Sequence, residues 1–187
     1  MSTLKVDTIL KRTGTGTITL GQSGDTISIP SGATLSSAGT NTLTGIANTP
    51  SFSAKLSGDQ TISSGSYTKI SFASEEWDTG GAYDTSNYRW TPGEVGKFNV
   101  KILIMWNNVT AQNQKLQLAI YKNGSFYADV ENIGSSATGA DPTLMISLDL
   151  SLSATDYIEA YAYQSTGGGI EIVANYSWFQ GQKILGA

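Results

Sequence analysis

Three neighbouring stretches decide the fold of this chain: Gly80-Gly81-Ala82-Tyr83-Asp84, Tyr88-Arg89-Trp90-Thr91-Pro92, and Gly96-Lys97-Phe98-Asn99-Val100. The paired glycines predict a turn, because glycine adopts backbone conformations that other residues avoid. A short strand, a Pro-Gly turn and a longer strand then follow in order. The three stretches therefore predict consecutive β-strands joined by tight turns.

The chain repeats this pattern of strands and turns from residue 50 onward. Every aromatic residue lies there, and no apolar period of helical spacing and useful length appears. Asn123-Gly124 predicts a hairpin, since both residues tolerate a positive φ. The expected strands are Ser51–Leu56, Thr68–Phe72, Tyr88–Trp90, Gly96–Asn107, Leu116–Lys122, Thr143–Leu152, Asp156–Tyr163, Ile170–Val173 and Tyr176–Gln182. Many short strands with regular turns predict an all-β sandwich or jelly roll.

Residues 1–49 differ from the rest in composition and predict a separate segment. They contain no aromatic residue, few charges and many Gly, Ser and Thr residues. Short strand-like pieces recur at roughly eight-residue intervals, each after a glycine. Their apolar residues are Ile18, Leu20, Ile27, Ile29, Leu35 and Leu43. Three chains wound about one axis would bury these residues against one another, which predicts a trimeric β-stalk; a flexible linker is the alternative.

Composition excludes several classes of function. The chain has 187 residues but no Cys and no His, so it cannot build a thiolate nucleophile, a Ser-His-Asp triad or a cysteine–zinc site. Its formal net charge of -4 argues against nucleic-acid binding, which needs a basic surface. No stretch approaches the roughly 20 apolar residues of a membrane helix, and the N-terminus lacks the apolar core of a signal peptide. We therefore expect a protein made in the cytoplasm that does not insert into a membrane.

Five short motifs, taken in order, resemble the globular domain of the C1q/TNF family. They are Pro50-Ser51-Phe52-Ser53-Ala54, Gly80-Gly81-Ala82-Tyr83-Asp84, Trp90 with Pro92 and Gly96-Lys97-Phe98, Lys122-Asn123-Gly124, and Phe179-Gln180-Gly181. Trp90 stands where the family usually has Phe, and the strand after it is aliphatic where the family is often aromatic, which indicates a distant relative. The resemblance implies a jelly-roll head over residues 50–187 that forms homotrimers and has no catalytic residues.

The opening residues 1–9 are similar to the N-termini of fibre-like structural proteins of tailed phages, especially of marine phages. In such proteins a short N-terminal segment docks on the virion and a trimeric domain faces outward. The resemblance implies a virion-anchor segment at Leu4, Val6, Ile9 and Leu10 that contacts other virion proteins. It agrees with the missing signal peptide, because phage structural proteins assemble inside the host cell. The expected location is the virion.

Two groups of carboxylates are candidates for chemistry. Glu75, Glu76, Asp78 and Asp84 would supply oxygen ligands for Ca²⁺, which some C1q-like trimers bind, although a solvated surface loop is the alternative. The pair Asp129 and Glu131 would suit glycoside hydrolysis, with an alternating polar face as the simpler explanation. No other cofactor is expected.

The aromatic residues of the second region are candidates for contacts or for packing. Trp77 lies beside three acidic residues and a glycine turn, so it is the best candidate for an exposed contact. Trp106 and Trp178 are expected in the core or along a trimer axis. Tyr157, Tyr161 and Tyr163 alternate along one strand face, as an aromatic band between subunits would require.

The function expected from these features is a structural and adhesive virion protein, a tail fibre, spike or head fibre. Three heads would present their loops together to a host-surface glycan or protein, or to the virion itself, so that weak contacts add up. A free trimeric lectin-like binding protein is the alternative, and a glycan-cleaving fibre is the third hypothesis.

Overall fold

The computed structural model describes residues 19–20, 22–34, 48–107, 109–110, 113–133 and 139–184. The chain divides into two units, Met1–Thr44 and Gly45–Ala187, and each is described by itself. The expected boundary after residue 49 stays a prediction. Outside the described residues lie the expected anchor and part of the expected stalk: Leu4, Val6, Ile9, Leu10, Ile18, Leu35 and Leu43.

The described part of the first unit contains turns and no strand. Gly24 and Gly32 have φ values of 94° and 84°, and each lies in a turn. Leu20, Ile27 and Ile29 are exposed. The strand-like piece expected around Ile27 is therefore not a strand in the single chain, because one copy offers its apolar residues nothing to pack against. The stalk role of these residues stays a prediction.

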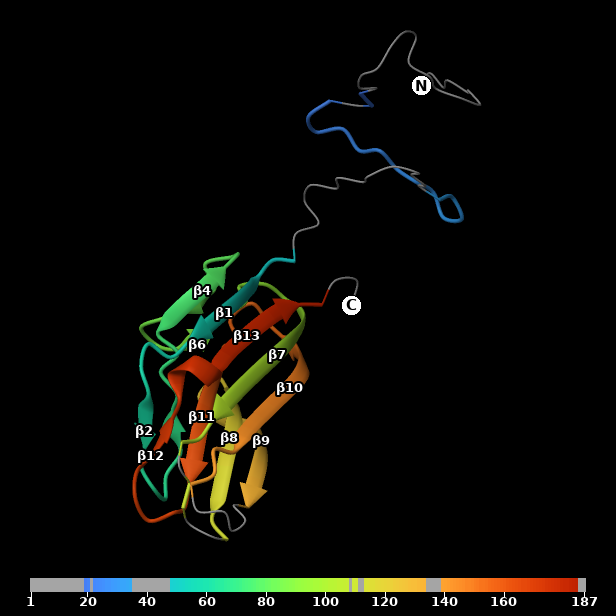
Figure 1. Cartoon of the computed structure of the whole chain (residues 1–187). Helices are drawn as coiled ribbons and strands as arrows, with labels where there is room; N and C mark the ends of the chain where they lie inside the picture. The colour runs from blue at the N-terminus through green and yellow to red at the C-terminus, as the bar shows by residue number, and fades with distance from the viewer. Residues whose placement is uncertain are drawn as a thin grey trace, which may run out of the picture. The chain divides into compact units, whose positions relative to one another are not determined.

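The second unit is an all-β sandwich (Figure 1). Its elements are β1 (Ser51–Lys55), β2 (Gln60–Ile62), β3 (Thr68–Lys69), β4 (Ser74–Asp78), β5 (Tyr83–Asp84), β6 (Arg89–Trp90), β7 (Gly96–Met105), β8 (Lys115–Lys122), β9 (Ser125–Ile133), β10 (Thr143–Leu152), β11 (Ile158–Gln164), β12 (Ile170–Ile172), the 3₁₀ turn η1 (Ala174–Tyr176) and β13 (Trp178–Lys183). Across the described ranges, no helix has the length and apolar character needed to cross a membrane.

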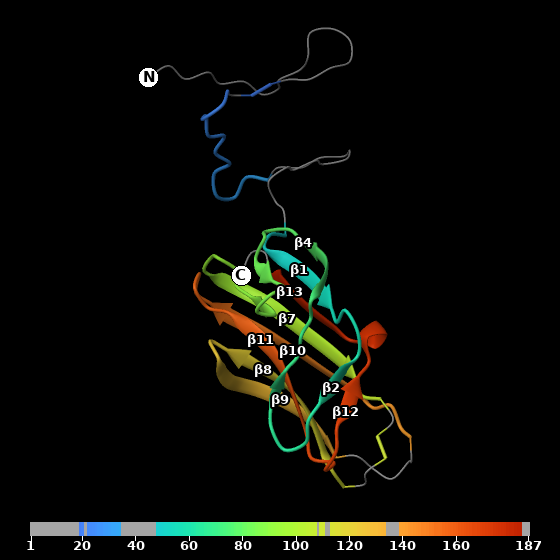
Figure 2. The same cartoon turned by 90° about the vertical axis from the view of Figure 1, so that its left-hand side faces the viewer.

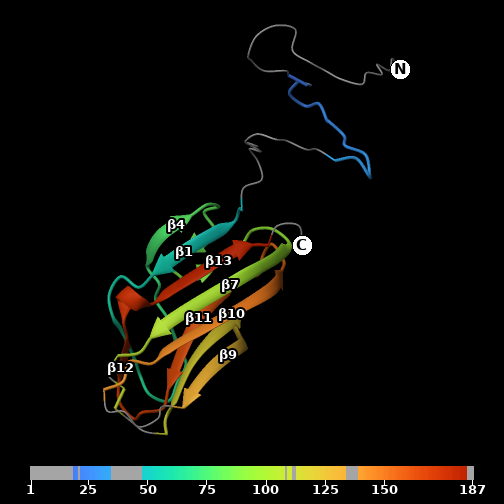
Figure 3. The same ribbon diagram turned by 45° about the vertical axis from the view of Figure 1, so that its right-hand side comes forward.

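Two large antiparallel sheets face each other, as Figures 2 and 3 show from two sides. The five-stranded sheet has the order β10-β7-β13-β1-β4. The six-stranded sheet has the order β5-β6-β11-β8-β9, with β3 also paired to β11, and β12 pairs with β2 separately. The first strand of the unit thus pairs with the last, and β7 lies between β10 and β13. This order is a jelly roll.

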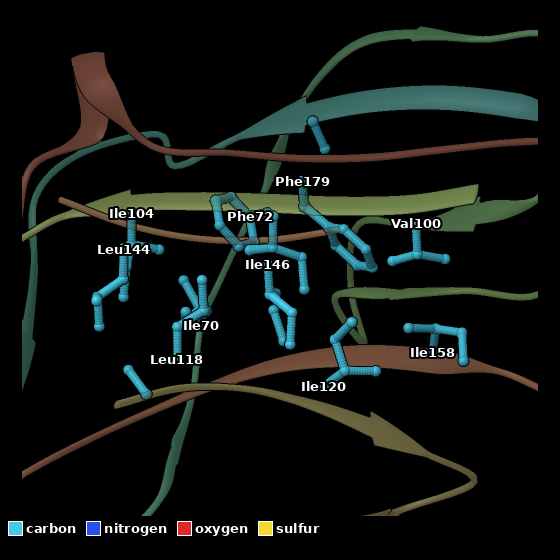
Figure 4. Packing of buried hydrophobic residues seen from close by; sticks show 14 of the residues in the cluster. Ile70, Phe72, Val100, Ile104, Leu118, Ile120, Leu144, Ile146, Ile158 and Phe179 are labelled. Atoms are coloured by element: carbon cyan, nitrogen blue, oxygen red, sulfur yellow. The ribbon is translucent and has the colours of Figure 1, made fainter. Parts of the chain in front are cut away.

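Alternate residues of the strands fill the space between the sheets (Figure 4). Val100 and Ile104 of β7 point inward from the five-stranded sheet. Leu118 and Ile120 of β8 and Ile158 of β11 meet them from the other sheet. Burying each such side chain stabilises the fold by about 1.5–3 kcal/mol, so this layer is the main source of stability.

The aromatic residues of the sequence motifs meet in one cluster of the core. Tyr83 stacks on Phe52 with a centroid distance of 4.5 Å and an interplanar angle of 11°. Trp90 lies 5.2 Å from Phe52 and 5.4 Å from Phe98, and Phe179 meets Phe52 edge-on at 4.8 Å. Motifs that are far apart in the sequence therefore form one packing unit, which explains why they occur together.

Four strands lie outside the expected strand ranges. The acidic segment Ser74–Asp78, for which a solvated surface loop was the alternative, is the strand β4. Gln60–Ile62, Tyr83–Asp84 and Ser125–Ile133 form the strands β2, β5 and β9. Strand β4 pairs only with β1 at the edge of its sheet and is exposed over most of its length. An edge strand of this kind carries charged side chains and lacks the apolar alternation that identifies a strand in sequence.

Candidate interaction surfaces

Asp78, one of the candidate calcium ligands, holds the glycine turn that follows β4. Its Oδ1 accepts a hydrogen bond from the Gly80 N–H at 3.0 Å, and its Oδ2 accepts one from the Tyr83 N–H at 2.8 Å. Tyr83 is itself buried and donates its hydroxyl to the Phe72 carbonyl at 2.8 Å. Both oxygens of Asp78 are thus engaged in fixing the turn that places Tyr83 in the core.

Asp84 closes the next turn in the same way. Its Oδ1 accepts hydrogen bonds from the Ser86 and Asn87 N–H groups at 2.9 Å each, and its Oδ2 accepts one from Asn87 Nδ2 at 2.6 Å. The hydrogen bonds from Asn87, above all the one from its side chain, hold the pKa of the Asp84 carboxyl below its ordinary value. Asp84 is therefore a turn residue.

Glu76 lies at an irregularity in the pairing of β1 with β4. It forms an ion pair with Lys55 and accepts a hydrogen bond from Ser53 Oγ at 3.1 Å. Within the described ranges, no group of three or more acidic side chains lies close enough together to hold a metal ion. Glu76, Asp78 and Asp84 are engaged separately by the strand and its two turns, and the role of these residues and Glu75 as calcium ligands stays a prediction.

Trp77 is 44% exposed on the outer face of the five-stranded sheet. It pairs with Ser53 of β1, which pairs in turn with Gln180 of β13. A shallow pocket of about 90 Å³ lies there. Its side-chain lining includes Trp77, Asn99, Lys101, Gln180 and Gln182. The structure leaves Trp77 accessible beside polar neighbours, and its role as a contact stays a prediction.

The other end of this outer face is apolar. Trp178 of β13 pairs with Leu103 of β7, which pairs with Met145 of β10. Trp178 and Leu103 are half-buried, and Met145 is 54% exposed. We call these three residues the apolar stripe. Trp178 thus lies outside the core, whereas Trp106 is fully buried, as expected.

The apolar stripe was not predicted as a unit, although β7 carries a sequence signal for it. Its first half alternates between exposed and buried residues, with Lys97, Asn99 and Lys101 on the outer face. The alternation then fails, because Leu103 and Met105 are apolar at outward positions. An apolar residue at a solvent-side position of a strand indicates a surface that another element or molecule covers.

Exposed apolar residues also lie along β9, at the neighbouring edge of the sandwich, with the carboxylates Asp129 and Glu131 between them in the strand. Tyr127 and Ile133 of β9 are 52% and 58% exposed. Strand β9 ends the six-stranded sheet, and β10, which carries Met145, ends the five-stranded sheet beside it (Figure 3). The β9–β10 edge and the apolar stripe are therefore distinct surfaces that share only Met145.

A cluster of aromatic rings covers part of the six-stranded sheet on its solvent side. Tyr121 and Tyr161 stack at 4.0 Å, and Tyr67 lies 5.2–6.0 Å from Tyr163, Tyr121 and Phe126. Partial burial raises the pKa of the Tyr67, Tyr121 and Tyr161 hydroxyls above the ordinary value. Tyr161 and Tyr163 share one strand face, as expected, but that face lies outside the core.

Asp129 and Glu131, the pair considered for glycoside hydrolysis, lie beside this cluster on β9. Gln117 Nε2 donates to Asp129 Oδ2 at 2.9 Å and to Glu131 Oε2 at 2.8 Å. Lys115 also forms an ion pair with Glu131 at 3.0 Å. One amide thus bridges both carboxylates, which supports the simpler explanation of an alternating polar face.

Comparison with known proteins identifies the fold. No protein-family model matches the chain, and no curated protein sequence does either. The structure of Eiger TNF from S. frugiperda matches with a TM-score of 0.56 and 12% identity, over 74% of this chain and 92% of that chain. The globular domain of zebrafish complement 1qA protein matches with a TM-score of 0.52 and 12% identity, over 72% of this chain and 97% of that chain.

The fold is that of TNF and C1q globular domains. The jelly roll expected from the sequence is thereby confirmed. A TNF/C1q-type jelly roll positions the apolar stripe on the outer face of its five-stranded sheet and the aromatic cluster on the outer face of its six-stranded sheet.

Proposed function

We propose that this chain is a homotrimeric structural and adhesive protein of a phage virion, with residues 50–187 as its exposed head. The observation that carries the proposal is the apolar stripe of Trp178, Leu103 and Met145 on a TNF/C1q-type jelly roll. In a monomer the stripe faces water, and association with a second copy covers it. The role is binding and assembly rather than catalysis.

Two different surfaces that carry exposed apolar residues favour a closed ring of copies. The apolar stripe of one head would pack against the β9–β10 edge of the next, where Tyr127 and Ile133 are exposed. Because the two surfaces differ, each contact joins the stripe of one copy to the edge of the next, which is a heterologous contact. Repeating such a contact gives a ring when the rotation between copies closes on itself. A ring of three is the assembly that the C1q/TNF resemblance implies.

The virion role is supported by the similarity of residues 1–9 to fibre-like proteins of tailed phages. A tail fibre, a spike and a head fibre all need an N-terminal segment that contacts other virion proteins. They also need a head that is repeated in space, because identical heads convert weak single contacts into firm attachment. The three-headed arrangement meets that need.

The oligomeric state tests the trimer. Sedimentation equilibrium of the full chain should give three copies per particle at micromolar concentration. Met145→Glu places a charge in the stripe at a position that is already exposed, so the variant should fold and run as a monomer. Val95→Glu is the matched control, since Val95 is 75% exposed just before β7 and is not one of the residues that define either surface, and it should remain trimeric. A monomeric parent chain would overturn the proposal.

Particle incorporation tests the virion role. A chain lacking residues 1–12 should still form trimers but should be lost from purified phage particles, as measured by immunoblotting and by imaging of labelled particles. A free lectin-like protein predicts the opposite result, because its partner binding would not depend on those residues. Absence of the full chain from particles would reject the virion role while leaving the trimer intact.

A further inference from the structure

One end of the jelly roll carries a polar pocket whose lining contains none of the site residues predicted from the sequence. The loop between β11 and β12 lies at this end, whereas β1 begins and β13 ends at the opposite end (Figure 1). The pocket has a volume of about 450 Å³, within the range of small-molecule sites. Its lining includes Thr61, Asn107, Thr110, Thr166, Gly168 and Glu171.

The pocket is lined by hydroxyls, an amide, a carboxylate and glycine backbone. Glu171 Oε2 accepts a hydrogen bond from Asn107 Nδ2 at 3.2 Å. Within the described residues, no hydrogen bond occupies Glu171 Oε1 or the side-chain hydroxyls of Thr61 and Thr110. No Lys or Arg is among the lining residues, so the pocket offers nothing to neutralise a phosphate, sulfate or carboxylate. These groups match a ligand that is uncharged and rich in hydroxyls.

A buried glutamine holds the loop that forms one wall. Gln164 is fully buried, and its Nε2 donates to the carbonyls of Ile62 at 2.8 Å and Gly168 at 2.6 Å. Its Oε1 accepts both the N–H and the hydroxyl of Thr166 at 2.7 Å each. The Gln164 side chain thus donates two hydrogen bonds and accepts two, and these bonds join β2, at Ile62, to the loop between β11 and β12. A loop fixed in this way loses little conformational entropy when a ligand binds.

Strand β2 approaches this loop closely. A Cβ atom added to Gly169 would lie 2.8 Å from Thr61 Cγ2, so a larger residue there would require the Thr61 side chain to shift. Thr61 also pairs with Glu171 of β12, which places it beside the carboxylate of the pocket. A preformed polar pocket of this size suits one sugar unit, because a sugar ring carries hydroxyls that both donate and accept.

We propose that this pocket binds a neutral saccharide. The inference deepens the adhesive part of the proposed function and rests on it for its biological use, but the pocket lies within one chain. Each head would bind weakly, and three heads would add by avidity. Glu171 would accept hydrogen bonds from sugar hydroxyls, and Thr61 and Thr110 would exchange hydrogen bonds with them.

The test uses the full chain and an array of neutral, sialylated and sulfated oligosaccharides, followed by titration calorimetry with the neutral glycans that bind. Glu171→Gln should weaken binding roughly 10- to 100-fold, as expected for a hydrogen bond to a charged group. Thr61→Val keeps the methyl group that packs on Gly169 and should weaken binding roughly tenfold. Glu75→Gln, on β4 at the other end of the unit, changes the charge equally and should bind like the parent.

Three results would overturn the inference: no neutral glycan binds, the array selects sialylated or sulfated glycans, or Glu171→Gln and Thr61→Val bind like the parent chain. Thermal unfolding of each variant verifies that it is folded. The monomeric variant Met145→Glu should retain the single-site affinity. Loss of the trimer and loss of saccharide binding are therefore separate outcomes.

Discussion

Asn123 and Asp156 tie together two turns that are 33 residues apart in the sequence. Asn123 Nδ2 donates to Asp156 Oδ1 at 2.7 Å, and the Tyr157 N–H donates to Asn123 Oδ1 at 2.9 Å. Asp156 Oδ2 accepts the Ser153 N–H at 2.9 Å and pairs with Lys122 at 2.9 Å. The β8–β9 hairpin is thus fastened to the turn between β10 and β11.

The stabilisation from this fastening should depend on pH. The hydrogen bond from Asn123, then those from Ser153 and Lys122, hold the pKa of Asp156 well below its ordinary value. Because the folded pKa is below the unfolded value of about 3.9, the stabilisation is complete well above that pH and is lost as the pH falls through the folded pKa. Asp156→Asn should therefore have a lower urea midpoint of unfolding than the parent chain at pH 7. The difference between the two midpoints should be smaller at pH 3.

The matched control for this prediction is Glu75→Gln, an exposed carboxylate on β4. Its urea midpoint should follow that of the parent at both pH values. A difference between Asp156→Asn and the parent that stays constant from pH 7 to pH 3 would contradict the electrostatic explanation.

Replacing Gly181 with a larger residue should destabilise the head. A Cβ at this position would lie 2.7 Å from Phe52 Cε1 and 2.8 Å from the Trp90 ring, inside the cluster where the motifs meet. Gly181→Ala should lower the free energy of unfolding by about 1–3 kcal/mol, the usual cost of overpacking a core. Gly58→Ala, where a Cβ meets nothing within 4 Å, should change stability little. Equal urea midpoints for the two variants would refute this account.

The aromatic cluster on the six-stranded sheet should stabilise the head. Tyr67→Ala removes three ring contacts, each of which contributes about 0.5–1.5 kcal/mol. Tyr67→Phe removes only the hydrogen bond to Gln117 Oε1 at 3.2 Å and should cost about 1 kcal/mol. Tyr176→Ala, at a ring that is 56% exposed, serves as the control in chemical denaturation. Tyr67→Ala should have the largest effect of the three.

The ion pair between Lys69 and Glu159 should matter more than the other ion pairs of the head. Their Nζ and Oε1 atoms are 2.5 Å apart, and Glu159 is only 4% exposed. Lys69→Met should cost about 3 kcal/mol, the lower end for breaking a buried pair, since the Lys69 side chain is 32% exposed. Urea unfolding of the variant and the parent chain measures this loss.

Two further variants verify this explanation. Lys69→Met combined with Glu159→Gln should recover part of the lost stability, since no buried charge then lacks a partner. Lys115→Met breaks an exposed pair with Glu131 and should change the free energy of unfolding much less than Lys69→Met does. An equal cost for Lys69→Met and Lys115→Met would show that burial of Glu159 is unimportant.

Local features of the fold could be predicted from the residues alone. The Asn123-Gly124 hairpin, the turn at Gly80 and Gly81, and the alternation along β7 each depend on the conformational preferences of a few adjacent residues. The all-β class follows from the same local signals, and the jelly roll followed from the order of the motifs. These predictions succeed because backbone sterics and two-residue periodicity act within a strand or a turn.

The surfaces required the three-dimensional arrangement. Alternation along a strand separates its residues into two faces but does not say which face is buried. The pattern therefore put Tyr161 and Tyr163 on one face of β11 without showing that this face lies toward solvent. Trp178, Leu103 and Met145 come from three strands and become neighbours only through long-range pairing. The polar pocket likewise joins Thr61 to the glycine loop near residue 168. Such contacts depend on which strands pair and in what register, and no short stretch of sequence contains that information.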